Sequence, residues 1–274
     1  RGSVLSCRRL GRLGRLKGAA LAGSMPAWRG LLVLASGLLL AAQRAVAYTP
    51  VEVHGKLSVS GNKIVGEHGQ PVRLRGMSMF WSQWMGQYWN KDAIDWLVKD
   101  WKVTLIRAAM GVNPDGYIDH SDEEKAKLCA VVDAAIDNGI YVVVDWHSYE
   151  ANTQVDQAKA FFAEMSQKYG KVPNVLFEIF NEPQEIGWGD TIKPYHEQIV
   201  PVIREHSDNI IICGTRTWSQ EVDEASRDPV SGENIAYTIH FYAASMGQDL
   251  RNKVSEALSN GAAIFATEWG TCEY

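Results

Sequence analysis

The chain has 274 residues, of which 46% are hydrophobic, a composition that excludes an intrinsically disordered protein and suits one large domain or two small ones. Its formal net charge of −5 is unevenly distributed, because residues 1–47 contain eight Lys or Arg and no acid. Residues 48–274 therefore carry 19 basic and 32 acidic residues, a formal net charge of −13. This balance argues against nucleic acid or an anionic membrane as a partner, since both bind basic surfaces.

The N-terminal region predicts a secreted protein. Residues 1–24 precede a methionine and are expected to be upstream or leader sequence outside the fold. Residues 25–47 have the pattern of a secretory signal peptide, with the apolar run Leu31–Ala42 before the small-x-small cleavage site Ala45-Val46-Ala47. The apolar run is shorter than the roughly 20 residues that span a bilayer, so a retained membrane anchor is the less favoured alternative. We expect a mature extracellular domain, residues 48–274, with no membrane association.

Cysteine usage gives little further constraint. Cys129, Cys213 and Cys272 remain in the predicted mature domain, so at least one of them has no disulfide partner there. No Cys-x-x-Cys pair and no Cys/His cluster occurs in the sequence, which disfavours a structural zinc site.

A hairpin is predicted first, because the turn Ser60-Gly61-Asn62 separates two short apolar runs; we expect it to close one end of the domain. Seven apolar runs then alternate with helical patterns at a spacing of roughly 25 to 40 residues, about one strand–helix unit. The predicted strands are Val72–Phe80, Val103–Met110, Tyr141–Trp146, Val175–Phe180, Ile210–Cys213, Ile235–Tyr242 and Ala262–Thr267. The predicted helices are Lys91–Trp101 with Asn90 as N-cap, a helix opened by a capping box at Ser121–Glu124, Asp156–Tyr169, Thr191–His206 and Asp249–Ser259. The polar segment Ser219–Gly232 is expected to hold a short helix at most.

This alternation predicts an α/β protein with a parallel sheet and outer helices, either doubly wound or closed into a barrel. A doubly wound nucleotide-binding fold needs a glycine-rich turn after an early strand, and Arg75-Gly76-Met77-Ser78 is not one. Polar residues at the carboxyl ends of the strands instead favour a TIM (β/α)8 barrel. Only four residues follow Gly270 after the seventh strand, so we expect the barrel to be C-terminally truncated, lacking a strand and two helices.

Two of the predicted strands end in a glutamate. Val175–Phe180 continues into Asn181-Glu182-Pro183, and Ala262–Thr267 continues into Glu268-Trp269-Gly270. A pair of carboxylates across a barrel mouth can hydrolyse a glycosidic bond, with retention when close together and inversion when water fits between them. We assign Glu182 as general acid/base and Glu268 as nucleophile; the alternative is two unrelated loop carboxylates.

Two polar residues are expected to support this pair. Arg107 ends the second strand, where its guanidinium can keep Glu268 ionised; the alternative is a structural ion pair with another acid. Asn181 precedes the acid and can donate to a sugar hydroxyl, although a turn residue would also fit this position.

Two histidines and a tyrosine lie at other strand ends. His147, His240 and Tyr242 are predicted to belong to the site, because three such side chains at barrel strand ends outweigh the structural role usual for a lone histidine. Metal ligation by His147 and His240 is the weaker alternative, since no third ligand is evident.

The chain is rich in aromatic residues near strand ends, and it contains ten Trp. Sugars stack their C–H faces on indole rings, so we predict Trp84 and Trp218 as substrate-binding platforms. Trp96 and Trp101 are predicted to be core residues of a helix, whereas Trp81 and Trp89 fit either role.

Together these motifs resemble glycoside hydrolase family 5, the cellulase family. The resemblance covers roughly residues 52–274 and is closest to the bacterial-type endoglucanase branch also found in plant-parasitic nematodes and other invertebrates. It rests on Arg75-Gly76-Met77-Ser78, Arg107-Ala108-Ala109-Met110, Asp145-Trp146-His147, Asn181-Glu182-Pro183 and Thr267-Glu268-Trp269-Gly270. It implies a TIM barrel, retaining endo-hydrolysis of β-1,4-glucan (cellulose), and neither a cofactor nor a metal. It assigns the active site to Arg107, His147, Asn181, Glu182, His240, Tyr242 and Glu268, with Trp84 and Trp218 as platforms.

The resemblance leaves two departures and several alternatives. Phe80 stands where many members of the branch have a histidine, and the family's tryptophan on strand eight lies beyond residue 274. A β-mannanase, a xylanase or another β-glycanase could use the same barrel. A non-catalytic glucan-binding protein and a metal-dependent barrel hydrolase are less favoured. We expect a monomer.

Overall fold

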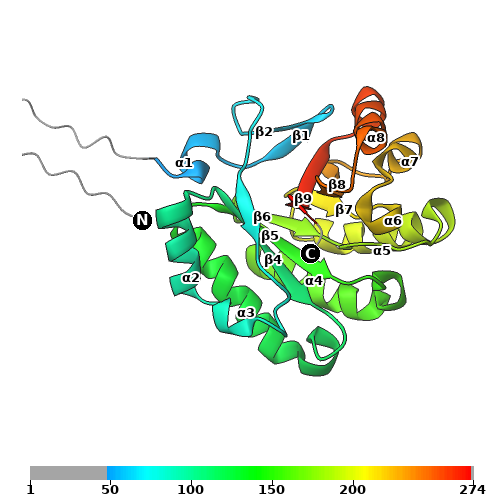
Figure 1. The fold of residues 1–274 in the computed structure, drawn as a ribbon. Coiled ribbons are helices and arrows are strands. Elements are labelled where there is room, and N and C mark those ends of the chain that lie inside the picture. Colours follow the sequence, from blue (N-terminus) through cyan, green and yellow to red (C-terminus); the bar gives the residue numbers. More distant parts are fainter. Residues whose placement is uncertain (1–47, 273–274) are drawn as a thin grey trace, which may run out of the picture. The chain divides into compact units, whose positions relative to one another are not determined.

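One sheet of seven parallel strands organises the computed structural model of the chain, which describes residues 48–272 (Figure 1). Each strand pairs with the next in sequence, so sheet order follows chain order. The strands are β3 (Gly76–Ser78), β4 (Leu105–Gly111), β5 (Tyr141–His147), β6 (Val175–Glu178), β7 (Ile211–Cys213), β8 (Ile235–Tyr242) and β9 (Ile264–Gly270). The sheet curls into a nearly closed barrel, which confirms the predicted TIM-barrel fold with seven strands among the described residues.

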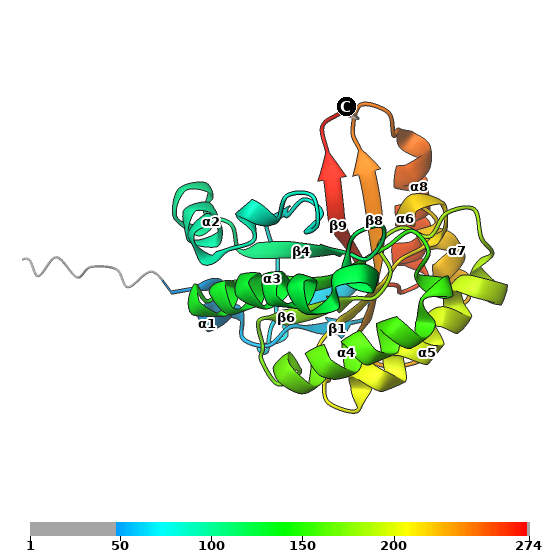
Figure 2. The same cartoon turned by 90° about the horizontal axis from the view of Figure 1, so that it is seen from below.

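Helices connect the strands and lie outside the sheet, as α3, α4 and α5 show in Figures 1 and 2. The α-helices are α1 (Pro50–His54), α2 (Lys91–Trp96), α3 (Tyr117–Asp137), α4 (Val155–Tyr169), α5 (Lys193–Arg204), α6 (Arg216–Ser219), α7 (Val222–Arg227) and α8 (Gln248–Ser259). The 3-10 helices are η1 (Gly86–Tyr88) and η3 (Ala151–Thr153), and the π-helices are η2 (Leu97–Trp101) and η4 (Trp188–Ile192). On α4, Phe161 and Phe162 lie on one buried face and contact Trp146 at centroid distances of 5.2 and 6.3 Å.

Residue alternation along the strands separates the outer core from the barrel interior. On β5, Val142 and Val144 belong to the cluster beneath the helices, whereas Tyr141 and Val143 belong to an interior cluster. The interior series continues to the carboxyl end of β5 with the polar residues Asp145 and His147. Polar groups on the inner face are therefore delivered to the carboxyl mouth of the barrel.

The predicted hairpin is confirmed as β1 (Ser58–Ser60) paired antiparallel with β2 (Lys63–Val65). Val59 and Ile64 pack against the interior cluster, and the Tyr141 hydroxyl donates to the carbonyl of Gly55 at 2.6 Å. The hairpin therefore covers the amino end of the barrel, opposite the mouth.

The capping box predicted at Ser121–Glu124 is not formed. Asn90 caps α2 as predicted, accepting from the N–H of Ala93 at 3.0 Å, but no side-chain bond caps α3. Instead of capping, Glu124 is buried and accepts from the hydroxyl of Ser82, with Lys127 at 2.7 Å. Tertiary contact with the loop after β3 therefore replaces the local capping box.

A bulge in β9 shapes the barrel mouth. Thr238 pairs with Phe265 but His240 pairs with Glu268, so β9 contains one residue more than β8 over this interval. In a regular strand, consecutive side chains point to opposite faces. Here Thr267 and Glu268 both bond to groups inside the barrel, because the bulge turns one of them inward.

The leader and signal peptide predicted for residues 1–24 and 25–47 lie outside the described residues, so these boundaries stay predictions. Within residues 48–272, no helix has the length and apolar character needed to cross a bilayer.

Candidate active site

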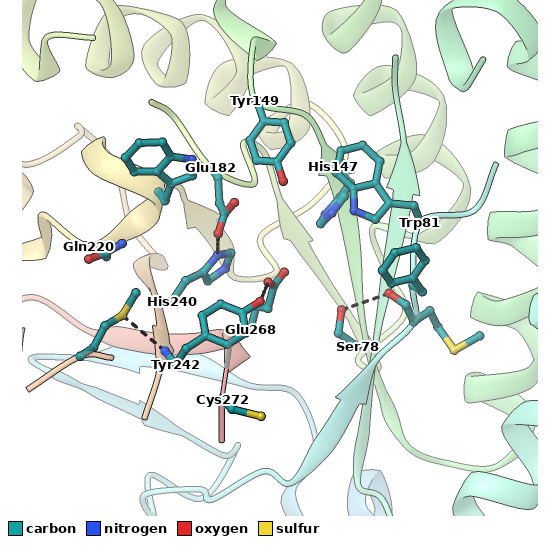
Figure 3. A pocket seen from close by; sticks show the side chains of 14 residues that line it. Ser78, Trp81, His147, Tyr149, Glu182, Gln220, His240, Tyr242, Glu268 and Cys272 are labelled. Carbon is teal, nitrogen blue, oxygen red and sulfur yellow. Dashed lines mark hydrogen bonds and ion pairs between the residues drawn. The ribbon is translucent and has the colours of Figure 1, made fainter. Parts of the chain in front are cut away.

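The carboxyl ends of the strands open into a cavity of about 640 Å³, a size typical of sites for small ligands. Figure 3 shows Glu182, His240 and Glu268 facing this space together. Of the predicted site residues, the lining includes His147, Glu182, Trp218, His240, Tyr242 and Glu268. Arg107 and Asn181 are buried and contact the site from behind, through bonds described below.

Glu268 is held as an anion. Arg107 Nη1 donates to its Oε2 at 3.0 Å, and the Tyr242 hydroxyl donates to its Oε1 at 2.6 Å. Burial alone would raise the pKa of this carboxyl, but the charges of Arg107 and His240 and the Tyr242 bond outweigh it and lower the pKa to about 2. The carboxylate is ionised at neutral pH and lines the cavity, as a nucleophile must.

Arg107 serves three carboxylates at once. Its Nε donates to Glu178 Oε2 at 2.7 Å, and its Nη2 lies 3.0 Å from Asp145 Oδ2. Burial would raise the pKa of Glu178, yet Arg107 and His240 lower it to about 2. For Asp145 burial dominates and raises the pKa well above its ordinary value, despite Arg107. The predicted contact with Glu268 and the alternative of a structural ion pair are thus both present.

Asn181 also depends on Arg107. Its Oδ1 accepts from Arg107 Nη2 at 2.7 Å, which fixes the orientation of the amide. Its Nδ2 is buried and has no hydrogen-bond partner among the described protein groups. The side chain just before Glu182 therefore carries an oriented donor with no protein acceptor.

Glu182 follows β6 and faces a histidine. Its Oε1 lies 2.7 Å from His240 Nδ1, and its backbone N–H donates to the carbonyl of Ser148 at 3.3 Å. Burial would lower the pKa of His240, but the nearby Glu178 carboxylate and the bond to Glu182 outweigh it and raise the pKa to about 9. Glu182 thus has a proton-bearing partner where Glu268 has a permanent cation.

His147 presents a neutral imidazole to the cavity. Its Nδ1 lies 2.7 Å from Asp145 Oδ2, which leaves Nε2 as the nitrogen available to a ligand. Burial and the nearby Arg107 charge lower its pKa to about 3. The ring is therefore uncharged at neutral pH and can hydrogen-bond a sugar hydroxyl.

Trp218 is joined to the backbone that carries Glu182. Residues 217–219 have φ of 56°, 53° and 57°, a conformation costing non-glycine residues of order 1–3 kcal/mol each. The N–H of Trp218 donates to the carbonyl of Pro183 at 2.9 Å, and the Ser219 hydroxyl donates to that of Asn181 at 2.7 Å. These bonds offset the strain and fix the indole relative to the acid.

A second group of aromatic side chains also lines the cavity. Trp81 lines it, contacts the His147 ring edge-on at a centroid distance of 4.3 Å, and stacks on Trp84 at 4.9 Å. Trp84 is outside the lining and 51% exposed, so its predicted role as a platform is untested. Phe80, where the resemblance suggested a histidine, also lines the cavity.

Glu182, His240 and Glu268 offer ligand atoms within 4.8 Å of one another, a spacing that could accommodate a metal ion. Both His240 nitrogens, however, already lie within hydrogen-bond distance of Glu182 and Thr267. We therefore interpret the cluster as hydrogen-bonded acid–base groups.

Sequence reasoning assigned no role to several groups that the structure brings to the site. Glu178 left a usable signal, because a glutamate inside the buried run Val175–Phe180 requires a partner. Asp145 and Thr267 belong to motifs that carry the family resemblance, but no role is predicted for them. Tyr149 belongs to no motif, so the sequence gives no reason to place it at the site.

The family model for cellulase (glycosyl hydrolase family 5) matches residues 65–274. The chain is 49% identical over 241 residues to Endoglucanase Z of Dickeya dadantii, covering 86% of this chain and 55% of that protein. It is 51% identical over 210 residues to Endoglucanase A of Evansella cellulosilytica, covering 74% and 43%. The chain thus spans about half the length of these curated relatives.

Solved structures show the same fold. A Cytophaga hutchinsonii structure has a TM-score of 0.81 and 52% identity, covering 82% of this chain and 74% of that chain. The catalytic domain of a Thermobifida fusca endoglucanase has a TM-score of 0.79 and 39% identity, covering 83% and 77%. A Glu-to-Gln variant of that Thermobifida domain is known in complex with cellotetraose.

Proposed function

The chain belongs to the cellulase family, glycosyl hydrolase family 5, and on that premise we propose that it is a secreted endo-β-1,4-glucanase that cleaves cellulose with retention. One observation carries this proposal. Two glutamates share one cavity with ligand atoms within 4.8 Å, one beside a permanent cation and the other beside a histidine. Such a pair supplies an ionised nucleophile and a proton donor to the same bond.

The proposed reaction has two displacements. In the first, a Glu268 oxygen attacks the anomeric carbon, the glycosidic C–O bond breaks, and Glu182 gives its proton to the leaving oxygen. In the second, Glu182 takes a proton from water, the water oxygen bonds to the anomeric carbon, and the bond to Glu268 breaks. Atoms and charge balance over the cycle, and both carboxyl groups return to their starting states.

Retention is supported by the closeness of the two glutamates. Retaining pairs are about 5–5.5 Å apart, whereas inverting pairs are about 6.5–9.5 Å apart to hold a water. Ligand oxygens of Glu182 and Glu268 within 4.8 Å favour the shorter class.

The choice of glucan draws on the relatives, which are named endoglucanases. The aromatic walls of the cavity suit any β-linked chain, so β-mannanase, xylanase or other β-glycanase activity is the alternative. The bacterial-type branch shared with invertebrates stays a prediction from sequence.

Substrate choice is tested by measuring reducing ends released from carboxymethylcellulose, mannan and xylan by the chain. The Glu268→Ala variant provides a matched blank for each polymer. We expect rapid release from carboxymethylcellulose alone. Faster release from mannan or xylan would refute the glucan assignment, and binding to cellulose without release would refute hydrolysis.

Secretion and a monomeric state are also part of the proposal. Secretion is supported by the signal-like residues 25–47, and both are tested by expression in a secreting host. We expect secreted protein whose N-terminal sequence begins at Tyr48 and whose mass by light scattering is that of one chain. Retention in the cell membrane would contradict the secretion proposal.

A further inference from the structure

Three polar groups surround the hydroxyl of Thr267. Its Oγ1 lies 2.7 Å from Glu178 Oε1 and 2.9 Å from His240 Nε2, and it is also bonded to the hydroxyl of Thr238. All of these groups are buried, so water does not compete for the bonds. The direct distance from Glu178 Oε1 to His240 Nε2 is 3.8 Å, too long for a hydrogen bond, and the Thr267 hydroxyl fills the gap.

A threonine hydroxyl has one proton to donate and two lone pairs to accept with. Glu178 is kept ionised by Arg107, so its oxygen can only accept, and a bond to a charged acceptor is the strongest available to this proton. The Thr267 proton therefore goes to Glu178. His240 Nε2 and the Thr238 hydroxyl must then both donate to Thr267.

We propose that Thr267 is a positioning residue that fixes the proton of His240 on Nε2, so that Nδ1 is the only nitrogen that exchanges a proton with Glu182. When the proton shared by the pair lies on Glu182, His240 is neutral and its bare Nδ1 accepts from Glu182. In cationic His240 an Nδ1–H donates to ionised Glu182, across the same 2.7 Å. Glu182 can thus change between acid and base while His240 keeps its orientation.

The β9 bulge makes this arrangement possible, because it turns Thr267 and Glu268 into the barrel together. One strand then serves both glutamates: Glu268 acts directly, and Thr267 acts on Glu182 through His240. The inference deepens the proposed function, since it assigns a role within the same acid–base pair.

Several charged groups set the proton affinity of His240. Anionic partners favour its cationic form and Arg107 disfavours it. The groups that act on it from the surrounding strands and loops are Arg107, Asp145, Glu178, Glu182 and Glu268. Thr267 is the neutral link that brings the charge of Glu178 to Nε2. Removing its hydroxyl should weaken the cationic form and lower the pKa of His240.

The direct test is side-chain ¹⁵N NMR of the whole chain labelled with ¹⁵N-histidine, with His240 signals assigned by their loss in His240→Gln. We expect Nε2 to stay protonated throughout and Nδ1 to titrate. In Thr267→Val the titration should move down by about one pH unit, the size expected for losing one bond to a charged group. Thr267→Ser should restore both the tautomer and the titration.

Two outcomes would overturn the proposal: protonation of Nδ1 in neutral wild-type His240, or the same titration in Thr267→Val as in wild type. If Thr267→Val fails to fold, Thr267→Ala makes the same test with a smaller side chain. The spectra require no turnover, so they decide this proposal even if the chain hydrolyses no glucan.

An activity profile adds a second readout. The alkaline limb of kcat/KM on a cello-oligosaccharide should move down by about one pH unit in Thr267→Val and return in Thr267→Ser. If kcat/KM fell in Thr267→Val while its alkaline limb stayed at the same pH, Thr267 would have only a structural role and the proposal would be contradicted.

Discussion

The two glutamates have the same side chain and opposite surroundings. Glu268 touches a guanidinium that cannot lose its proton and a tyrosine hydroxyl that can only donate to it. Glu182 touches a histidine whose proton can be on either partner. The proposed division between nucleophile and acid therefore depends on the groups that neighbour each carboxyl rather than on the carboxyl groups themselves.

Removing the nucleophile should have the largest effect. Glu268→Ala is expected to lower kcat by a factor on the order of 10⁴ or more, as for other covalent catalysts, measured on carboxymethylcellulose. Azide should restore cleavage of an activated aryl cellobioside. Because azide then attacks directly, the product should be the α-azide, whereas azide acting on a Glu182→Ala variant should give the β-azide. The opposite pattern of anomers would exchange the two roles.

Removing the acid should have a smaller, substrate-dependent effect. Glu182→Gln is expected to slow cleavage of cellulose by roughly 10²–10⁴-fold, the usual contribution of a general acid. An aryl glycoside with a good leaving group needs little protonation, so its bond-cleavage step should slow far less than that of cellulose. The step is measured as the pre-steady-state release of the phenol. Equal losses on both substrates would refute the acid role.

The guanidinium should matter for stability as well as for catalysis. Arg107→Met removes the cation from Glu178, Asp145 and Glu268 and should destabilise the fold by about 3–5 kcal/mol, the cost of leaving buried charge unpaired. Arg107→Lys keeps the charge and should lose less. Urea unfolding of both variants measures the difference; equal stabilities would argue that geometry rather than charge is what Arg107 supplies.

Tyr242→Phe should have a modest effect on the nucleophile side. It removes the 2.6 Å bond to Glu268 while Arg107 keeps the carboxylate ionised. We expect kcat/KM to fall about tenfold, the value of one bond to a charged group. No change in rate would show that the hydroxyl does not orient the nucleophile.

The free energy of unfolding should fall at both acid and alkaline pH, because the groups around the two glutamates have shifted pKa values. Glu268 and Glu178 have pKa values lowered from 4.5 to about 2, so their contribution is present above pH 4.5 and is lost as pH falls toward 2. His240 has a pKa raised from 6.5 to about 9, so its contribution is complete below pH 6.5 and is lost as pH rises through 9. His147 and His196 have pKa values lowered from 6.5 to about 3 and about 4, so their contribution is complete above pH 6.5 and is lost as pH falls. Thermal unfolding across pH should therefore show a maximum Tm near pH 6.5. A His240→Gln variant should flatten only the alkaline side.

Short-range patterns were sufficient for the architecture. The spacing of apolar runs predicted seven strands with outer helices, and a glutamate directly after two of those runs predicted the carboxylates at the mouth. Both predictions depend on periodicity and on strand ends, which are local properties of a parallel barrel.

The platform residues show where local reasoning weakens. Sequence favoured Trp84 as a sugar platform, yet Trp81 is the tryptophan of this loop that lines the cavity. Both rings lie in one loop without a regular period, and it is tertiary packing of Trp81 against His147 and Tyr149 that orients that ring into the cavity.

Local patterns in the chain were enough to predict the barrel and to place Glu182 and Glu268 at its mouth, because strand period and the cost of a carboxylate at the end of a buried run are local properties. The surroundings of each glutamate depend instead on tertiary contacts. Arg107 reaches Glu178, Asp145 and Glu268 from a different strand, and a one-residue bulge in β9 brings Thr267 and Glu268 to the same side. Such contacts join residues up to 161 positions apart, and no local pattern records which of them will meet.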